Sequence, residues 1–247
     1  MIRCVTMPKL VTFLLTLLIA ATALGQQKTA DELARRSIDV MAGAAWEKAR
    51  YFEFTFVVEH GNTRSIAVPQ RWDRTTGQYR VTGRDAKQND FVVVMNVTTQ
   101  KGRVWLNGEE VTDARRDDTL ALAYKRFLND TYWLLMPLRM LDAGVVREAM
   151  GERTDSCGRT WDVLKLTTAG DTSWAWINRD SGLVEEWDMR VQGAPAEQPP
   201  VEVMFHDYGR YAGVLISTRR EVRNGNQTIR IENLKISGDV PKGAFEK

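Results

Sequence analysis

The sequence predicts a mainly β protein of the α+β class, built on one strongly curved antiparallel sheet. Two sets of short segments with apolar residues at every second position flank a central region of helical periodicity. Tight-turn signals, among them Asn107-Gly108 and Asn224-Gly225, join neighbouring strands and make the sheet antiparallel. A sheet with so many strands does not stay flat, so we expect it to curl around its helices.

The N-terminal residues 1–25 read as a cleavable signal peptide. A charged start is followed by an apolar run over residues 10–21, which is too short to cross a bilayer comfortably, and by the small-x-small site Ala23-Leu24-Gly25. An uncleaved anchor is the alternative. Because Gln26, not cysteine, follows the cleavage point, we expect no lipid anchor. Residues 26–247 then form one exported domain, periplasmic or secreted.

Removal of the signal peptide changes the charge and the thiol content. The whole chain has 34 Lys and Arg against 32 Asp and Glu; without Arg3 and Lys9 the two sets are equal at 32. A neutral chain lacks the positive excess that nucleic-acid binding requires, so we expect no nucleic-acid partner. Cys4 leaves as well, so Cys157 is a lone thiol near a turn and no intramolecular disulfide forms.

The first predicted element is a helix over residues 29–41. Thr29 is placed to cap it and Glu32 to complete a reciprocal capping box, while Gly43 ends it. Pro69 indicates an edge or a bulge in the strand that contains it. The expected strands are at 52–58, 66–72, 79–81, 91–97 and 103–106, and then, after the central region, from 145, at 161–168, 172–177, 183–191, 201–206, 214–222 and 227–236.

The central region predicts two helices, at residues 117–128 and 131–141. The second is apolar on all sides, so it must be buried or must line an apolar cavity. After the last strand, residues 237–247 form a tail with a single apolar plug, Phe245.

Signatures of catalysis are mostly absent, and we expect neither an enzyme nor a bound metal or cofactor. The chain has no G-x-S-x-G elbow, Walker loop or G-x-G-x-x-G motif. His60, His206 and Cys157 are too few for a typical zinc site. A hydrolase with His60 or His206 as its base remains open, and so does a calcium site at the acidic run of Glu185, Glu186 and Asp188, although a solvated strand face explains that run.

The aromatic content supplies the candidate site. The chain has eight tryptophans, and large rings of this kind fill cores or line pockets for apolar ligands. Plain core packing is the alternative for all of them. The candidate lining residues of an apolar cavity are Trp72, Trp105, Tyr132, Trp133, Leu135, Met136, Leu138, Met140, Trp174 and Trp176.

The expected order of elements is a signal peptide, an N-terminal helix, a run of antiparallel strands, a helical insertion and further strands. Several motifs accompany this order: Gly43-Ala44-Ala45-Trp46, Phe52-Glu53-Phe54-Thr55-Phe56, Asn129-Asp130-Thr131-Tyr132-Trp133-Leu134-Leu135-Met136-Pro137, Asn178-Arg179-Asp180-Ser181-Gly182-Leu183, and Ile231-Glu232-Asn233-Leu234-Lys235-Ile236 with Val240-Pro241 and Phe245. The order of elements resembles the LolA/LolB-like superfamily of periplasmic lipoprotein carriers, and the motifs resemble a secreted branch of it. The similarity spans nearly the whole mature chain.

The resemblance implies an incomplete barrel whose concave face is covered by the N-terminal helix and the central helical insertion. It implies a non-catalytic binding or carrier protein for an apolar small molecule, a lipid or an acylated protein. The alternative on the same scaffold is a protein-interaction or envelope-stress sensor module. We expect no membrane span and a monomer.

Overall fold

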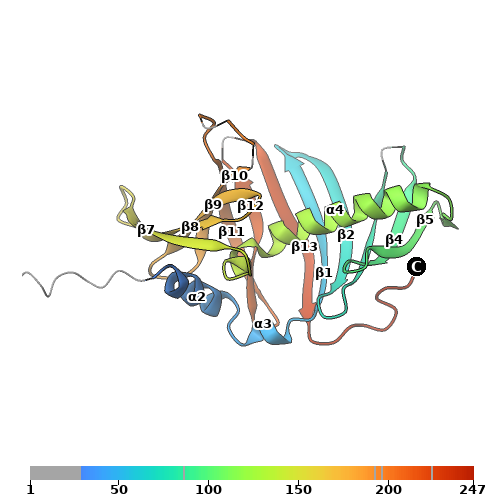
Figure 1. Ribbon diagram of the computed structural model, residues 1–247, viewed down its shortest axis with the longest axis horizontal. Coiled ribbons are helices and arrows are strands. Elements are labelled where there is room, and N and C mark those ends of the chain that lie inside the picture. The colour runs from blue at the N-terminus through green and yellow to red at the C-terminus, as the bar shows by residue number, and fades with distance from the viewer. Residues whose placement is uncertain (1–28, 86, 192, 196, 224) are drawn as a thin grey trace, which may run out of the picture.

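A computed structural model describes residues 29–247 except 86, 192, 196 and 224 (Figure 1). The predicted signal peptide, residues 1–25, lies outside the described residues. The elements are α2 (Ala30–Met41), α3 (Ala45–Lys48), β1 (Tyr51–His60), β2 (Thr63–Asp73), β3 (Gln78–Arg84), β4 (Asp90–Asn96), β5 (Lys101–Leu106), β6 (Glu109–Glu110), α4 (Arg115–Leu135), the 3-10 helix η2 (Met136–Arg139), β7 (Val146–Thr154), β8 (Thr160–Thr167), β9 (Asp171–Asn178), β10 (Val184–Val191), β11 (Val201–Tyr211), β12 (Val214–Val222) and β13 (Gln227–Ser237).

The strands form one antiparallel sheet in the order β6-β5-β4-β3-β2-β1-β13-β12-β11-β10-β9-β8-β7. The first and last long strands, β1 and β13, pair at its centre and so join the two halves of the chain. The two edges, β6 and β7, do not meet, and α4 lies between them in sequence. The sheet is therefore an incomplete barrel, and the predicted fold class is confirmed.

Alternation along the strands separates a concave face from an outer face. In β1, Phe52, Phe54 and Phe56 are each at most 2% exposed and belong to the main hydrophobic core. Their cross-strand partners in β2 are Trp72, Gln70 and Val68, in that order. Because side chains at every second position share a face, these rows define the concave surface on which the helices lie.

The N-terminal helix α2 begins as predicted. Thr29 accepts a hydrogen bond from the backbone N–H of Glu32, and the Glu32 carboxylate accepts one from the backbone N–H of Thr29. Leu33 and Met41 are buried, and the Ser37 hydroxyl donates to the carbonyl of Gly182 at 2.8 Å. The helix therefore closes one end of the concave face, against β7, β8 and β12.

The central region is one long helix, α4, and not the predicted pair. Figure 1 shows α4 crossing the concave face, and it contacts β4, β5 and β12. The helix continues through residues 129–130 and ends at Leu135, one residue before η2, which holds Pro137 near its start. A proline cannot continue an α-helix, because it lacks an N–H and clashes with the preceding turn. The chain instead tightens into η2.

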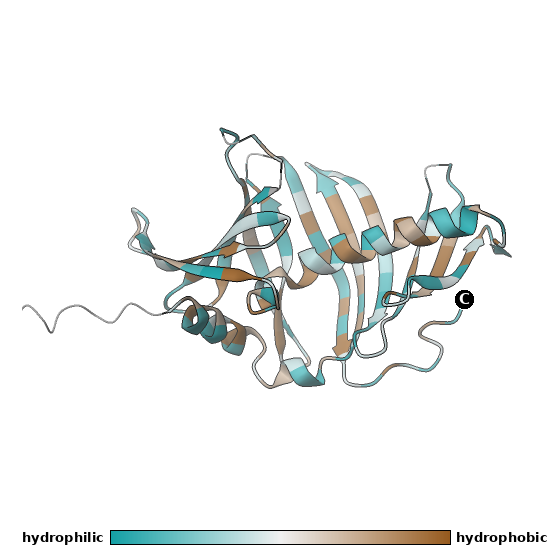
Figure 2. Cartoon of the chain, in the orientation of Figure 1, coloured by the Kyte–Doolittle hydropathy of each residue, from teal (hydrophilic) through white to brown (hydrophobic). Residues whose placement is uncertain are grey.

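Two hydrophobic clusters fill the concave side. The larger one joins α2, η2 and the end of α4 to β1 and β8–β13, and the smaller one joins the first half of α4 to β2–β5. Figure 2 shows bands of apolar and polar residues alternating along the strands and along α4. In the part of the chain that the structure describes, none of the helices combines the length and apolar character of a membrane-spanning helix.

The C-terminal tail lies on the outer face. The ring of Phe245 packs edge-on against Tyr51, with 6.3 Å between the ring centroids. Arg71 and Arg80 donate to the carbonyls of Ala244 and Glu246 at 3.2 and 2.9 Å. The predicted apolar plug thus fixes the tail over β1, β2 and β3, away from the concave side.

Candidate functional site: an apolar cavity beneath α4

A cavity of about 1020 Å³ lies between α4 and the sheet. Pockets for small-molecule ligands commonly have volumes of about 300–1,000 Å³, so this one is large. Its sheet wall comes from β1–β5 and β13, and its other wall is α4 from Arg115 to Trp133. The residues that line it from the sheet are mainly aliphatic or aromatic: Phe56, Val58, Ile66, Val81, Phe91, Val93, Leu106 and Ile229.

The side chains that α4 contributes to the cavity are apolar in the interior and mostly charged or polar near the mouth. Ala123 and Trp133 present apolar surface to the cavity, and Leu122 does so at the mouth, where it is 66% exposed. Charged and polar side chains surround the entrance. They are Arg115, Asp118, Thr119, Lys125, Arg126 and Asn129 from α4, with Arg84, Asp85, Lys87 and Asn89 at the β3–β4 turn and His60 and Gln227 at the strand ends. The site is therefore an apolar chamber with a polar rim.

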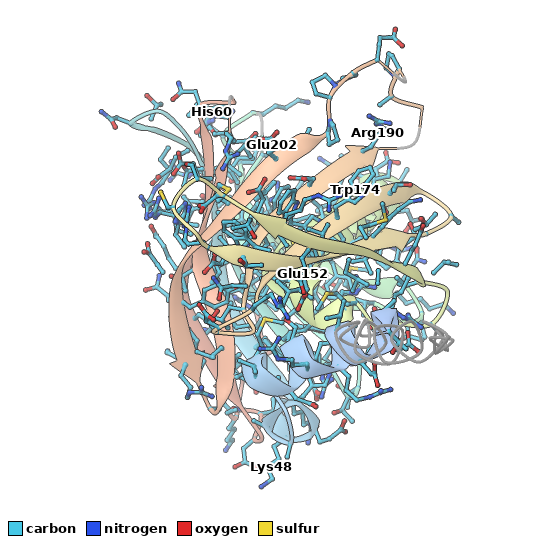
Figure 3. All side chains as sticks on the ribbon, turned by 90° about the vertical axis from the view of Figure 1, so that its left-hand side faces the viewer. Lys48, His60, Glu152, Trp174, Arg190 and Glu202 are labelled. Carbon is cyan, nitrogen blue, oxygen red and sulfur yellow. The ribbon has the colours of Figure 1, made fainter. Side chains whose placement is uncertain are left out.

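His60 and Lys48 lie at opposite ends of the curved sheet (Figure 3). His60 contributes to the cavity rim, so the mouth is at the His60 end. At the other end, Trp46 of α3 packs on Phe52 with ring centroids 6.3 Å apart. The chamber therefore opens at one end and is filled by core side chains at the other.

A buried polar bridge fixes α4 to the sheet beside the cavity. Asp130, 1% exposed, accepts hydrogen bonds from Gln70 of β2, from Asn129 at 2.8 Å and from Arg126 at 3.2 Å. Gln70 in turn accepts from the Tyr79 hydroxyl at 2.7 Å. Burial raises the pKa of the Asp130 carboxyl, although its three donors favour the charged form.

A second polar contact holds the far end of α4. Arg220 of β12 is 1% exposed and donates to the carbonyl of Leu134 at 3.1 Å, where the negative end of the helix dipole favours a cation. Its guanidinium carbon lies 5.2 Å from the centroid of the Phe205 ring. Burial lowers the pKa of Arg220 to about 10. The bridge and this contact hold α4 to the sheet at two points, one on β2 and one on β12.

We expect the substitution Asp130→Ala to destabilise the protein by about 1–3 kcal/mol, because the buried Gln70 amide loses its acceptor. Urea unfolding followed by circular dichroism measures the change. Asp118→Ala on the exposed first turn of α4 is the control, with an expected loss below about 1 kcal/mol. Equal effects of the two substitutions would contradict the structural role of the bridge.

Comparison with known proteins supports the fold. No family model matches the sequence, and no curated protein matches it. The LolA superfamily protein NE2245 from Nitrosomonas europaea superposes with a TM-score of 0.50 at 9% identity, over 89% of this chain and 98% of that one. This protein has a LolA-like fold. A DUF1329 family protein from Desulfovibrio piger gives a TM-score of 0.47 at 13% identity, over 87% and 95% of the two chains.

Of the ten predicted lining residues, Trp133 is the one that lines the cavity of the LolA-like sheet. Trp72 lies deeper, between Phe52 and Phe127, with ring centroids 5.4 and 5.3 Å away. Tyr132 is half-buried against the main core. The remaining four from this region, Leu135, Met136, Leu138 and Met140, are at most 7% exposed within that core. The alternative of core packing therefore describes the 3-10 segment better than cavity lining does.

Trp105, Trp174 and Trp176 lie on the outer face, so their predicted position in the cavity is wrong. Ser173, Ala175 and Ile177 of β9 are buried on the concave side, and the intervening Trp174 and Trp176 point the other way. The indole N–H of Trp176 donates to Asp188 at 2.8 Å. Trp105 alternates in the same way with Val104 and Leu106, which face inward, and stacks under the Arg103 guanidinium.

The apolar lining residues that the sequence did not single out are aliphatic side chains and phenylalanines, all smaller than tryptophan. Val81, Phe91, Val93 and Ile229 sit at alternate positions of predicted strands, and that alternation was the available signal. A prediction based on the largest aromatic rings therefore selected mostly residues that are packed in the core or on the outer face.

Each of the two histidines has a polar side-chain neighbour. The His60 ring nitrogen Nδ1 lies 3.2 Å from the Ser65 hydroxyl, but that hydroxyl donates its proton to the Val58 carbonyl at 3.1 Å. The Nε2 atom of His206 is 3.6 Å from Glu221. Among the described residues, no group of three or more His, Cys, Asp or Glu side chains could hold a metal ion. Cys157 is exposed, in a turn where its N–H donates to Asp155.

The acidic run on β10 is more enclosed than a solvated strand face. The Glu186 side chain is 17% exposed and lies 3.6 Å from Arg223. Burial, followed by the charge of Asp188, raises the pKa of Glu186 to about 7. The pKa of Asp188 is also raised, chiefly by burial. These carboxyls share the outer face with Trp176, so they belong to the outer surface and not to the cavity.

We expect stability to fall as the pH rises from about 4.5 to about 7, because folded Glu186 holds its proton more tightly than the unfolded chain does. Its stabilising contribution is complete below the unfolded pKa and is lost above the folded one. Glu186→Gln should flatten this dependence and stabilise the protein at pH 8 by about 2 kcal/mol. Urea midpoints at pH 5 and pH 8 test it, and an unchanged pH dependence in the variant would refute this assignment.

Proposed function

We propose that this protein is a non-catalytic carrier or binding protein for an apolar ligand, a lipid or an acyl chain, held in the cavity beneath α4. The observation that carries the proposal is the apolar wall of a chamber of about 1020 Å³ with an open mouth. Transfer of an alkyl chain from water to an apolar site is favourable by about 0.8 kcal/mol for each buried CH₂ group. A chamber with such walls supplies that stabilisation without specific polar contacts.

The position of the polar groups supports an elongated, amphiphilic ligand. Phe56, Val93 and Ile229 lie within, while Lys87 and Lys125 lie at the rim. A ligand with an apolar tail and a polar end matches this division. The buried Asp130 is occupied by its three donors, so its oxygens are used to hold the helix and not to hold a ligand.

A non-catalytic role fits the side chains around the chamber. Ser65 directs its proton to the Val58 carbonyl, so no activated hydroxyl faces the cavity from the His60 pair. The predicted signal peptide directs the protein out of the cytoplasm, so the proposed carrier acts in the periplasm or in the medium. Gln26 at the predicted cleavage point favours a protein that is free of a lipid anchor.

Native mass spectrometry and lipid extraction of protein purified from its own periplasm test the proposal. We expect a co-purifying lipid or fatty acid, and saturable binding of the apolar fluorescent probe N-phenyl-1-naphthylamine to the delipidated protein. A protein that co-purifies with no lipid or fatty acid and also fails to bind the probe would contradict the proposal. Activity assays on lipid esters with the His60→Ala, His206→Ala double variant serve as the control for a hydrolase: hydrolysis lost in that variant would contradict the non-catalytic role.

A further inference from the structure

The sheet is split between β2 and β3 on the cavity side. Strand β2 pairs with β1 along its whole length, from Thr63 to Asp73. Its pairing with β3 is confined to Gln70, Arg71 and Trp72. Within the described residues, 63–69 therefore have a neighbouring strand on one side only, although β2 lies inside the sheet.

Pro69 accounts for the place where the pairing stops. It is the first β2 residue beyond the paired segment, and it has no N–H to donate to a neighbouring strand. From that point β3 continues in register with β4, from Thr82 opposite Val92 to Arg84 opposite Asp90, and diverges from β2. The two strands thus form a wedge that widens toward the cavity mouth.

The wedge is an open cleft of about 720 Å³ that adjoins the main cavity. Both spaces share five wall residues, Ile66, Arg84, Asp85, Phe91 and Arg126. The other walls of the cleft are more polar than those of the main cavity. They include Ser65, Thr82, Gln88 and Asp90, together with Gly83, which has no side chain to fill the space.

An unpaired strand edge presents backbone N–H and C=O groups at regular spacing, and extended peptides pair with such edges. We propose that residues 63–69 of β2 form a docking edge for an extended peptide segment of a partner protein, one of whose apolar side chains enters the main cavity. Entry of the apolar side chain into the cavity rests on the proposed function of the cavity, whereas docking of the peptide backbone on residues 63–69 does not.

The geometry favours one extended segment over other occupants. A second folded copy would bring a whole sheet edge, which the flanking strand β3 blocks. A lipid offers too few amide groups to satisfy a row of backbone donors and acceptors. Side chains of an added strand alternate between the two faces, so every second one points to the concave side, where Ile66 and Phe91 already belong to the cavity wall.

The test uses a fluorescently labelled seven-residue peptide of alternating leucine and threonine with lysines at both ends. The natural sequence is not needed, because the main chain makes the hydrogen bonds. We expect fluorescence anisotropy to show saturable binding, and the fully N-methylated peptide, which lacks backbone donors, to bind at least about tenfold more weakly. Hydrogen exchange of those amides in residues 64–68 that point away from β1 should slow by at least about tenfold when the unmodified peptide binds.

A variant that fills the wedge locates the binding. A Cβ at position 83 would lie 3.0 Å from the tip of the Phe91 ring, which can turn, so Gly83→Leu places a side chain beside Phe91, where the cleft adjoins the main cavity. Gly170→Leu is the matched control, since nothing lies within 4 Å of a Cβ there. We expect the first variant to lose peptide binding by at least about tenfold and the second to keep it.

The outcomes separate the two proposals. Wild-type protein that binds neither peptide, with exchange at residues 64–68 unchanged, overturns the docking edge, and so does peptide binding that survives Gly83→Leu. N-phenyl-1-naphthylamine binding measured in the same samples reports on the cavity alone. Probe binding without peptide binding leaves the carrier proposal standing, and peptide binding without probe binding leaves only the docking edge.

Discussion

Replacing Leu135 with aspartate is expected to unfold the protein. Leu135 is 4% exposed at the end of α4, inside the main core. The substitution removes a buried aliphatic side chain, at about 2–5 kcal/mol, and adds a carboxyl group that has no partner there. Since natural domains are stable by only about 5–15 kcal/mol, the combined loss removes most or all of the folding free energy.

Thermal unfolding followed by circular dichroism measures this effect. Leu122→Asp is the matched control on the same helix, because Leu122 is 66% exposed and its replacement should change stability by no more than about 0.5 kcal/mol. A Leu135→Asp protein that melts within a few degrees of the wild type would show that the segment is not core. In that case the original assignment of Leu135 to a cavity wall would return.

The sheet could be predicted from the sequence because the alternation of apolar and polar residues along each strand shows which side chains are buried. Phe52, Phe54 and Phe56 repeat every second residue, and each is buried on the concave face. The capping box at Thr29 is equally local, since its two partners are three residues apart. Features of this kind need no knowledge of the tertiary structure.

The single long helix could not be predicted in the same way. Asn129 and Asp130 are polar residues in an apolar stretch, and by themselves they favour a break between two helices. In the structure Asp130 points inward to Gln70, sixty residues away in sequence, and the helix continues. A distant partner therefore decides the local structure, and the sequence pattern does not contain that information.

The candidate site was only partly predictable for a related reason. Alternation places Trp174 and Trp176 on one face but does not say which face is concave. Their cross-strand neighbours are Asp188 and Glu186, and this acidic row indicates the outer side once the pairing is known. The cavity lies between inward side chains of the sheet and α4, and α4 is held to the sheet by the Asp130 bridge and the Arg220 contact, whose partners are far apart in the sequence.

Replacing Trp133 with aspartate is expected to abolish binding of an apolar probe while the protein remains folded. Trp133 is half-buried and lines the cavity, so a carboxylate at this position can reach water through the mouth. The charged group must, however, lose part of its hydration when an alkyl chain fills the chamber. We expect the affinity for N-phenyl-1-naphthylamine to fall by at least about 30-fold, which corresponds to about 2 kcal/mol.

Trp174→Asp is the matched control, because it makes the same chemical change on the outer face, where Trp174 is half-buried on β9. It should leave probe binding within about twofold of the wild type. Circular dichroism at the binding temperature verifies that both variants are folded. A folded Trp133→Asp protein with normal probe binding would place the apolar ligand elsewhere. Loss of binding in both variants would point to a general change of the sheet, because Trp133 lines the cavity whereas Trp174 lies on the outer face.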